Sequence, residues 1–159
     1  MRDGAAVLTA AHAPLPAPVT WTAVAGGGAF RNGSPVSVST KSDLATALVG
    51  TGQAKPGEDA QTFRRIGASM TAMLPAALLV GAAVPATLPL LRVAAGQQDA
   101  FWQYSDVRSG LLGGALLVAE AGGVVTDTHG RPWTTSSTDL LAAAPGLHPA
   151  LVDVLSTVA

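Results

Sequence analysis

The chain has 159 residues, which is the length of one domain and enough to bury a hydrophobic core. Hydrophobic residues make up 48% of it and charged residues only 12%, about half the usual charged share. Ten acidic and nine basic residues give a net charge of −1 without a basic stripe, so we expect neither nucleic acid nor a membrane as a partner. The lack of cysteine excludes disulfides, thiol catalysis and thiolate metal sites.

The N-terminal sequence has no long apolar run behind a positively charged start, so no signal peptide is expected. The most apolar stretch, residues 73–91, is interrupted by Pro75, Pro85 and Pro89. A membrane-spanning helix of about 20 residues does not easily tolerate three prolines. We therefore expect a soluble protein, and the lack of cysteine suits a cytoplasmic location.

The first forty residues predict antiparallel strands. Residues 5–11 form a short apolar run that ends at a proline cluster, which favours a loop or a sheet edge. Residues 20–24 alternate as a strand does, a glycine run and a turn at Asn32-Gly33 follow, and residues 36–39 alternate again. This pattern is typical of a hairpin, so we expect two or three antiparallel strands here.

From residue 41 onward the pattern predicts helices and buried strands in alternation. After a short helical turn capped by Ser42 or Asp43, we expect strands at 47–50, 77–84, 99–102, 124–127 and 140–144, and helices at 60–74, 86–95, 110–121 and 149–158. The continuous apolar run 77–84 favours a strand buried on both faces. Pro89 is compatible with the second helix only in its first turn. Such alternation indicates a mixed or parallel sheet with helical layers, within a single domain 1–159.

Four segments in chain order resemble motifs of one protein family. They are GGGAFRNG at 26–33, LLRVAAGQQDAF at 90–101, GALLVAEAGGVVTD at 114–127, and LAAAP with His148 at 141–148. They are similar to the GxGAFxNG, LAxVAxGxxDxY, GxxIVxEAGGxVTD and LAANPxLH motifs of the inositol monophosphatase superfamily. Because all four occur in order across nearly the whole chain, the sequence resembles the C-terminal part of such a protein.

The resemblance implies the fold and the chemistry. It implies a layered α/β fold in which residues 1–40 form strands of a first, antiparallel sheet, and residues 41–159 form a C-terminal α/β half with a mixed sheet. It also implies hydrolysis of phosphate monoesters by Mg²⁺ ions held in a carboxylate cluster. The family's Glu-Glu metal motif, its DPxDGT motif and its N-terminal helical pair have no counterpart here, and we expect Met1 to begin after them.

The resemblance places the family's remaining site residues on positions without carboxylates. The metal-binding aspartate of the WDxAAG run falls on Gly110, the substrate-side glutamate on Gln103, and the GSA motif on residues 84–86. The substrate-side candidates are therefore Gln103, Asp106 and Gly110. Asp106 is also the weak metal candidate, which would require a loop shift, and the alternative is an ion pair with Arg108. The catalytic residues are unknown.

The other candidate side chains have structural interpretations. The acidic pair Glu58-Asp59 lies in a Pro/Gly loop, where solvation is favoured over metal binding. Glu120 is expected to accept backbone N–H groups near the Gly-Gly turn, and Asp127 to form a turn. The three histidines lie far apart in sequence and are expected at the surface or in loops rather than in a metal site: His12, His129 and His148.

Three functions stay open. The favoured one is a degenerate family member that lacks metal-dependent hydrolysis, needs no cofactor, and binds a small phosphorylated or polyol molecule or a protein partner. The first alternative is a Mg²⁺-dependent phosphatase of inositol phosphate or a related sugar phosphate, completed by another chain or by a missing N-terminal segment. The second is an oligomeric scaffold protein whose exposed half-sheet pairs with a second copy. We expect a homo-oligomer or a heteromer.

Overall fold

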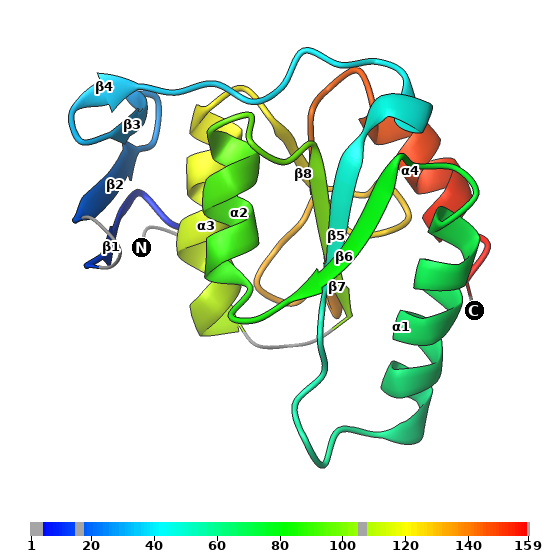
Figure 1. Cartoon of the computed structure of the whole chain (residues 1–159). Coiled ribbons are helices and arrows are strands. Elements are labelled where there is room, and N and C mark those ends of the chain that lie inside the picture. Colours follow the sequence, from blue (N-terminus) through cyan, green and yellow to red (C-terminus); the bar gives the residue numbers. More distant parts are fainter. Residues whose placement is uncertain (1–4, 15–17, 105–107, 159) are drawn as a thin grey trace.

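The computed structural model describes residues 5–14, 18–104 and 108–158, which form two sheets and their helices (Figure 1). The strands are β1 (Leu8–Ala13), β2 (Val19–Val24), β3 (Gly28–Arg31), β4 (Ser34–Pro35), β5 (Leu48–Gly52), β6 (Leu79–Ala83), β7 (Ala100–Tyr104), β8 (Val124–Thr126) and β9 (Asp139–Ala143). The helices are α1 (Ala60–Met73), α2 (Thr87–Ala94), α3 (Arg108–Glu120) and α4 (His148–Leu155), with a 3₁₀ turn at Leu44–Thr46.

The first sheet is antiparallel, with the strand order β1-β2-β3-β4. The β2–β3 hairpin turns through two glycines with positive φ, Gly26 and Gly28, a conformation that other residues rarely adopt. The strand predicted at 36–39 is wrong: β4 spans only Ser34–Pro35, and the N–H of Val36 makes one further backbone hydrogen bond to Ala29 of β3. The N–H of Val38 instead donates to the carbonyl of Ala121 at the end of α3. The chain therefore leaves the sheet to run along a helix.

The second sheet has the order β6-β5-β7-β9-β8 and is mixed: β6, β5 and β7 are parallel, and β9 is antiparallel to both β7 and β8. The predicted fold class, an antiparallel sheet followed by a mixed sheet with helical layers, is confirmed. The prediction that 77–84 is buried on both faces is wrong. Strand β6 is an edge strand that pairs only with β5, and Leu79 and Val84 are more than half exposed.

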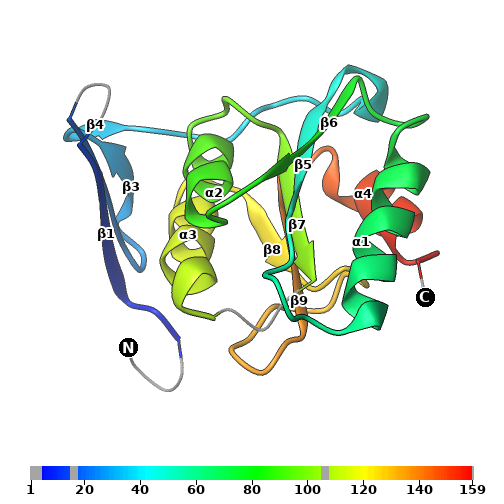
Figure 2. The same cartoon turned by 60° about the horizontal axis from the view of Figure 1, so that its bottom comes forward.

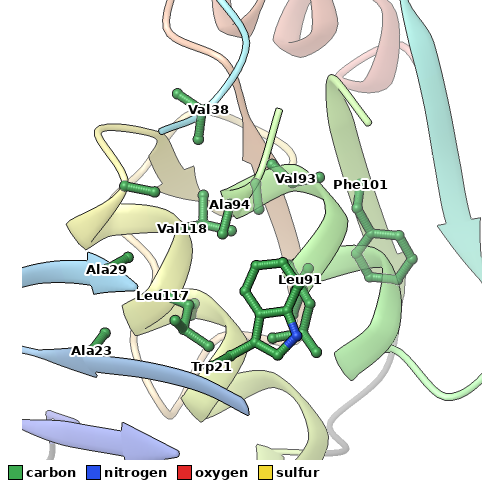
Figure 3. Close-up of a cluster of buried hydrophobic side chains, with 14 of the residues drawn as sticks. Trp21, Ala23, Ala29, Val38, Leu91, Val93, Ala94, Phe101, Leu117 and Val118 are labelled. Carbon is green, nitrogen blue, oxygen red and sulfur yellow. The ribbon is translucent and has the colours of Figure 1, made fainter. Parts of the chain in front are cut away.

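The helices form two layers around the second sheet. Helices α2 and α3 lie between the two sheets, and α1 and α4 cover the opposite face of the second sheet (Figures 1 and 2). One hydrophobic cluster fills the space between the sheets, where Trp21 of β2 points toward Leu91 of α2 and Phe101 of β7 lies beyond that helix (Figure 3). A second cluster joins the mixed sheet to α1 and α4. In the described residues, every helix is too short or too polar to cross a bilayer.

Helix starts follow local signals in the sequence. The Asp43 side chain accepts the N–H of Ala45 and caps the 3₁₀ turn, as predicted. Pro89 is the third residue of α2, so its missing N–H falls in the first turn, where no intrahelical partner exists. The predicted helix is therefore confirmed with its proline in place.

Small residues let α3 approach its neighbours closely. A Cβ atom on Gly113 would lie 2.5 Å from Oγ1 of Thr9 in β1. A Cβ atom on Gly114 would lie 2.5 Å from Cδ1 of Leu90 in α2. Both distances are shorter than real Cβ contacts. Glycine at these two positions therefore sets the spacing of the helices and the first sheet.

Glu120, the last residue of α3, ties this helix to the hairpin. Its two carboxylate oxygens accept the N–H groups of Gly26 (2.9 Å) and Gly28 (2.8 Å). These hydrogen bonds hold the pKa of Glu120 below its ordinary value, against the smaller opposing effect of burial. The predicted role as a backbone acceptor is confirmed, but its donors belong to the distant hairpin and not to the nearby Gly-Gly turn.

Gly114→Ala is expected to lower the free energy of unfolding by about 1–3 kcal/mol, because the added methyl group collides with Leu90. Urea denaturation measures the change. The matched control is Gly67→Ala on the exposed side of α1, where a Cβ meets nothing within 4 Å. The control should raise stability by about 0.5–1 kcal/mol through helix propensity. Equal effects of the two variants would contradict the close packing of α3.

Glu120→Gln is expected to destabilise the fold by about 1–3 kcal/mol at neutral pH, because an amide offers one acceptor where the carboxylate offers two. A lowered pKa means that the carboxylate stabilises the fold above its unfolded pKa, about 4.3, and that this contribution is lost as the pH falls through the folded pKa. The difference between wild type and variant should therefore shrink in acid. Asp153→Asn, on the exposed side of α4, is the charge-matched control. A difference that stays constant with pH would exclude this role.

Candidate functional site

The three parallel strands end at one edge of the mixed sheet. The register pairs Gly52 of β5 with Ala83 of β6 and Thr51 with Trp102 of β7, so these strands finish side by side. Helices α2 and α3 begin shortly after β6 and β7, at the same edge. In open α/β sheets, ligands bind outside the carboxyl ends of the strands. We call this region, formed by the ends of β5, β6 and β7 and the starts of α2 and α3, the carboxyl edge.

The first turns of α2 and α3 are tied together at the carboxyl edge. The hydroxyl of Thr87 donates to the carbonyl of Gly110 at 3.0 Å. At the start of α2, Ala86 provides no side-chain cap, Leu88 donates its N–H to the carbonyl of Pro85, and Pro89 has no N–H to offer. The amino end of α2 therefore presents few free donors to an anion.

Gln103 is the buried polar side chain of β7 at this edge. Its Oε1 has no hydrogen-bond partner among the described residues. The amide packs against β5, since a Cβ on Gly52 would lie 2.4 Å from Oε1. The substrate-side candidate thus contributes a neutral amide where the family motif has a carboxylate.

The described positions among the other predicted site residues contribute little side-chain chemistry. Gly110 lies in the first turn of α3 and presents only its backbone. Residues 84–86 are apolar and connect β6 to α2. Asp106 lies outside the described residues, so its two interpretations, a metal ligand or an ion pair with Arg108, stay predictions.

Two of the described carboxylates near the carboxyl edge, Asp59 and Asp139, have internal partners, whereas the buried Oε2 of Glu58 has no hydrogen-bond partner among the described residues and lies 3.9 Å from Nζ of Lys55. Asp59 caps α1: its oxygens accept the N–H and the hydroxyl of Thr62 at 2.7 and 3.1 Å, and the backbone hydrogen bond is the main cause of its lowered pKa. Asp139, opposite Tyr104 in the sheet register, accepts the N–H of Thr128 and a guanidinium N–H of Arg65. Sequence reasoning did not single out Asp139, because no motif marks it.

A polar hollow of about 330 Å³ lies on the α1 side of this edge. Its lining residues are Glu58, Asp59, Gln61, Thr62, Arg65, Tyr104 and Thr138. The Arg65 guanidinium lies 4.3 Å from the centroid of the Tyr104 ring, and the same guanidinium pairs with Asp139. Burial is the main cause of the raised pKa of Tyr104. Arg65, the one cation among the described lining residues, is therefore already engaged within the protein.

The residues that the structure describes at the carboxyl edge do not form a site that fits Mg²⁺. This ion requires hard oxygen ligands in octahedral geometry, usually including carboxylates. Within residues 5–14, 18–104 and 108–158, no three His, Asp or Glu side chains gather closely enough to hold a metal ion. Among the described residues, the ligand atoms at the ends of β5, β6 and β7 come from an amide, a hydroxyl and backbone carbonyls.

The remaining candidates lie elsewhere and serve the fold. Asp127 forms the predicted turn, accepting N–H groups from His129 and Arg131. Burial would raise its pKa, but these bonds and the Arg131 guanidinium outweigh burial and lower it. His12 on β1 and His129 in its turn are exposed, in agreement with the predicted surface or loop positions. The prediction is wrong for His148, which is half-buried at the start of α4; its Nε2 lies 2.8 Å from Oγ1 of Thr126, and burial lowers its pKa.

Comparisons with known proteins agree with this architecture. The sequence model of the inositol monophosphatase family matches residues 1–158. Probable inositol 1-monophosphatase ImpA of Mycobacterium tuberculosis is 30% identical over 172 residues, covering 99% of this chain and 58% of that protein. Inositol monophosphatase 2 of Rattus norvegicus is 36% identical over 124 residues, covering 77% of this chain and 42% of that protein.

Solved structures show the same fold. The IMPase of Thermotoga maritima superposes with a TM-score of 0.86 at 27% identity, covering 98% of this chain and 58% of that chain. The chain spans about half the length of the curated relatives it matches. With the family model matched over almost all of its residues, the chain belongs to the inositol monophosphatase family.

Proposed function

We propose that this chain is a degenerate inositol monophosphatase family member that lacks Mg²⁺-dependent hydrolysis of phosphate monoesters and acts as a binding module. The observation that carries the proposal is the composition of the carboxyl edge. Gln103 and Gly110 stand where the family motifs have carboxylates, and apolar residues 84–86 stand where they have a polar segment. The scaffold around these positions is intact, as the packing of α2 and α3 between the sheets illustrates.

The chemistry of phosphate-ester hydrolysis supports the proposed loss of activity. A metal ion in such a reaction neutralises the phosphate, lowers the pKa of the attacking water and stabilises the leaving oxygen. Amide and hydroxyl groups cannot replace the negative charge that holds the ion. Of the described carboxylates nearby, Asp59 is occupied by a helix terminus and Asp139 by Arg65, so recruiting either would require breaking hydrogen bonds that stabilise the fold. Glu58, whose buried Oε2 accepts no hydrogen bond from the described residues, would be a single carboxylate where the reaction needs a cluster.

The ligand class that we propose is a small polyol or its phosphate ester. The names of the relatives refer to inositol monophosphate, and an amide such as Gln103 can both donate to and accept from a hydroxyl group. With few free N–H donors at the start of α2, the hydroxyl groups of the ligand should contribute more than its phosphate.

One alternative keeps the catalytic activity. Because the chain spans about half the length of its relatives, a second chain or a further segment would supply the missing metal ligands. The resulting assembly would be a Mg²⁺-dependent phosphatase acting on inositol phosphate or a related sugar phosphate. Gly110 would still leave one motif carboxylate missing in such an assembly.

Calorimetric titration of inositol and of inositol 1-phosphate, each with and without Mg²⁺, tests both functions. We expect binding that Mg²⁺ does not strengthen, and no release of phosphate. Gly52→Ala should weaken binding at least tenfold, because the new methyl group displaces the Gln103 amide, whereas Gly67→Ala should leave binding unchanged. Mg²⁺-dependent phosphate release at about 10 s⁻¹, the middle of the usual enzyme range, would overturn the proposal. Failure to bind either compound would exclude the proposed ligand class.

A further inference from the structure

Two glycines lie side by side in the mixed sheet, next to a buried aromatic ring. The register pairs Gly50 of β5 with Gly81 of β6 on one side and with Phe101 of β7 on the other. Neighbours in such a row point to the same face of the sheet. Phe101 is fully buried and belongs to the hydrophobic cluster on the α2 side (Figure 3). The row therefore combines one large side chain with two positions that have none.

A hollow of about 250 Å³ lies here between the sheet and α2. Its lining includes residues of all three parallel strands and of α2: Gly50, Gly81, Phe101, Pro89 and Arg92. We call this hollow the glycine slot. A cavity of about 150 Å³ with apolar walls is large enough to hold a benzene molecule. The glycine slot therefore has room for a planar ring that carries one polar substituent.

Packing within the protein explains only one of the two glycines. A Cβ on Gly50 would lie 2.8 Å from Nε2 of Gln98 and would displace this amide from its hydrogen bond to the carbonyl of Ala100. A Cβ on Gly81 would meet nothing within 4 Å, and the φ of Gly81 is not positive. Glycine inside a strand weakens the strand, and it often marks a place where a ligand approaches the backbone closely. Gly81 thus keeps open a space that the described residues leave unfilled.

Arg92 gives the glycine slot a positive charge. It lies in the last turn of α2 and is the only charged residue among the described lining residues. Each ion pair within the described parts of the chain involves other residues. A guanidinium group can bind a carboxylate through two parallel hydrogen bonds. The buried Phe101 and Pro89 offer apolar walls to the rest of a ligand.

We propose that the glycine slot binds a small aromatic carboxylate. The ring lies on the backbone of Gly50 and Gly81 and contacts the Phe101 ring, since offset or edge-to-face contacts between aromatic rings are favourable. Its carboxylate pairs with Arg92. An aliphatic anion would leave the apolar walls without a partner, and a neutral ring would leave the charge without one. This ligand uses neither Gln103 nor Gly110, so the inference goes beyond the proposed function.

Titration with benzoate, followed in amide NMR spectra of the full chain, tests the site. We expect saturable shifts of the amide signals of Gly50, Gly81 and Phe101, with a dissociation constant below about 1 mM. Benzamide has the same ring without the charge, and acetate has the charge without the ring. Each should bind about tenfold more weakly or worse, because a contact with a charged partner or the apolar contact is lost. Unchanged amide signals, or equal affinity for benzoate and benzamide, would overturn the proposal.

Gly81→Ala separates ligand binding from folding. The new methyl group enters the glycine slot without colliding with the protein, so the affinity for benzoate should fall about fivefold or more while the melting temperature stays equal or rises. Gly67→Ala on the exposed side of α1, where a Cβ also meets nothing within 4 Å, is the matched control and should keep the wild-type affinity. Equal affinities of the two variants would contradict a ligand that lies on Gly81.

Arg92→Gln tests the charged contact. It removes the charge and keeps a polar side chain, so benzoate should bind about tenfold more weakly or worse, whereas the weak binding of benzamide should not change. Arg64→Gln, at an exposed position of α1, makes the same change in net charge and should leave benzoate binding unaltered. If both variants weakened benzoate binding equally, net charge alone would account for the effect, and pairing with Arg92 would be excluded.

Discussion

The close enclosure of α3 is the constraint on which the other layers depend. This helix contacts α2, the first sheet and the mixed sheet, so a polar stripe has no place on it and its sequence is apolar or small on nearly all sides. Gly113 and Gly114 allow Thr9 and Leu90 to approach to distances that any side chain would prevent. The two sheets can therefore share one thin helical layer. The starts of α2 and α3 then meet at the carboxyl edge, where Thr87 joins them.

The acidic residues that this chain shares with the family motifs hold the backbone in place. Asp99 accepts the N–H of Leu48 and the Lys41 ammonium group; burial opposes these bonds, but they prevail and lower its pKa. Glu120 holds the hairpin, and Asp127 holds its own turn. Each serves to fix one segment against another. Strong motif similarity is thus compatible with the proposed loss of carboxylates at the carboxyl edge, because these shared acidic residues stabilise the fold.

Sequence patterns predicted those elements whose signals are local. The helical period of residues 60–74 and the glycine turn of the hairpin needed no information from distant residues, and both are present. The sequence pattern gave wrong predictions where contacts between distant residues determine the local structure. The run 77–84 is apolar throughout, so it lacks the alternation that separates an edge strand from a buried one. Val38 bonds to α3 more than eighty residues away, which local alternation cannot reveal. At the candidate site, counting from the motifs located Gln103 and Gly110, but not the engagement of Asp139 with Arg65.

Residues 84–86 form the exit from β6 into α2 and so border the carboxyl edge. Where the family motif has a polar segment, Val-Pro-Ala offers no side-chain hydrogen-bond donor, and Val84 is 64% exposed. The backbone that follows adds little, because Leu88 donates its N–H to the carbonyl of Pro85 and Pro89 has no N–H. The proposed loss of hydrolysis therefore rests on this connection as well as on Gln103 and Gly110, since neither its side chains nor the start of α2 supplies the donors that a phosphate group would need.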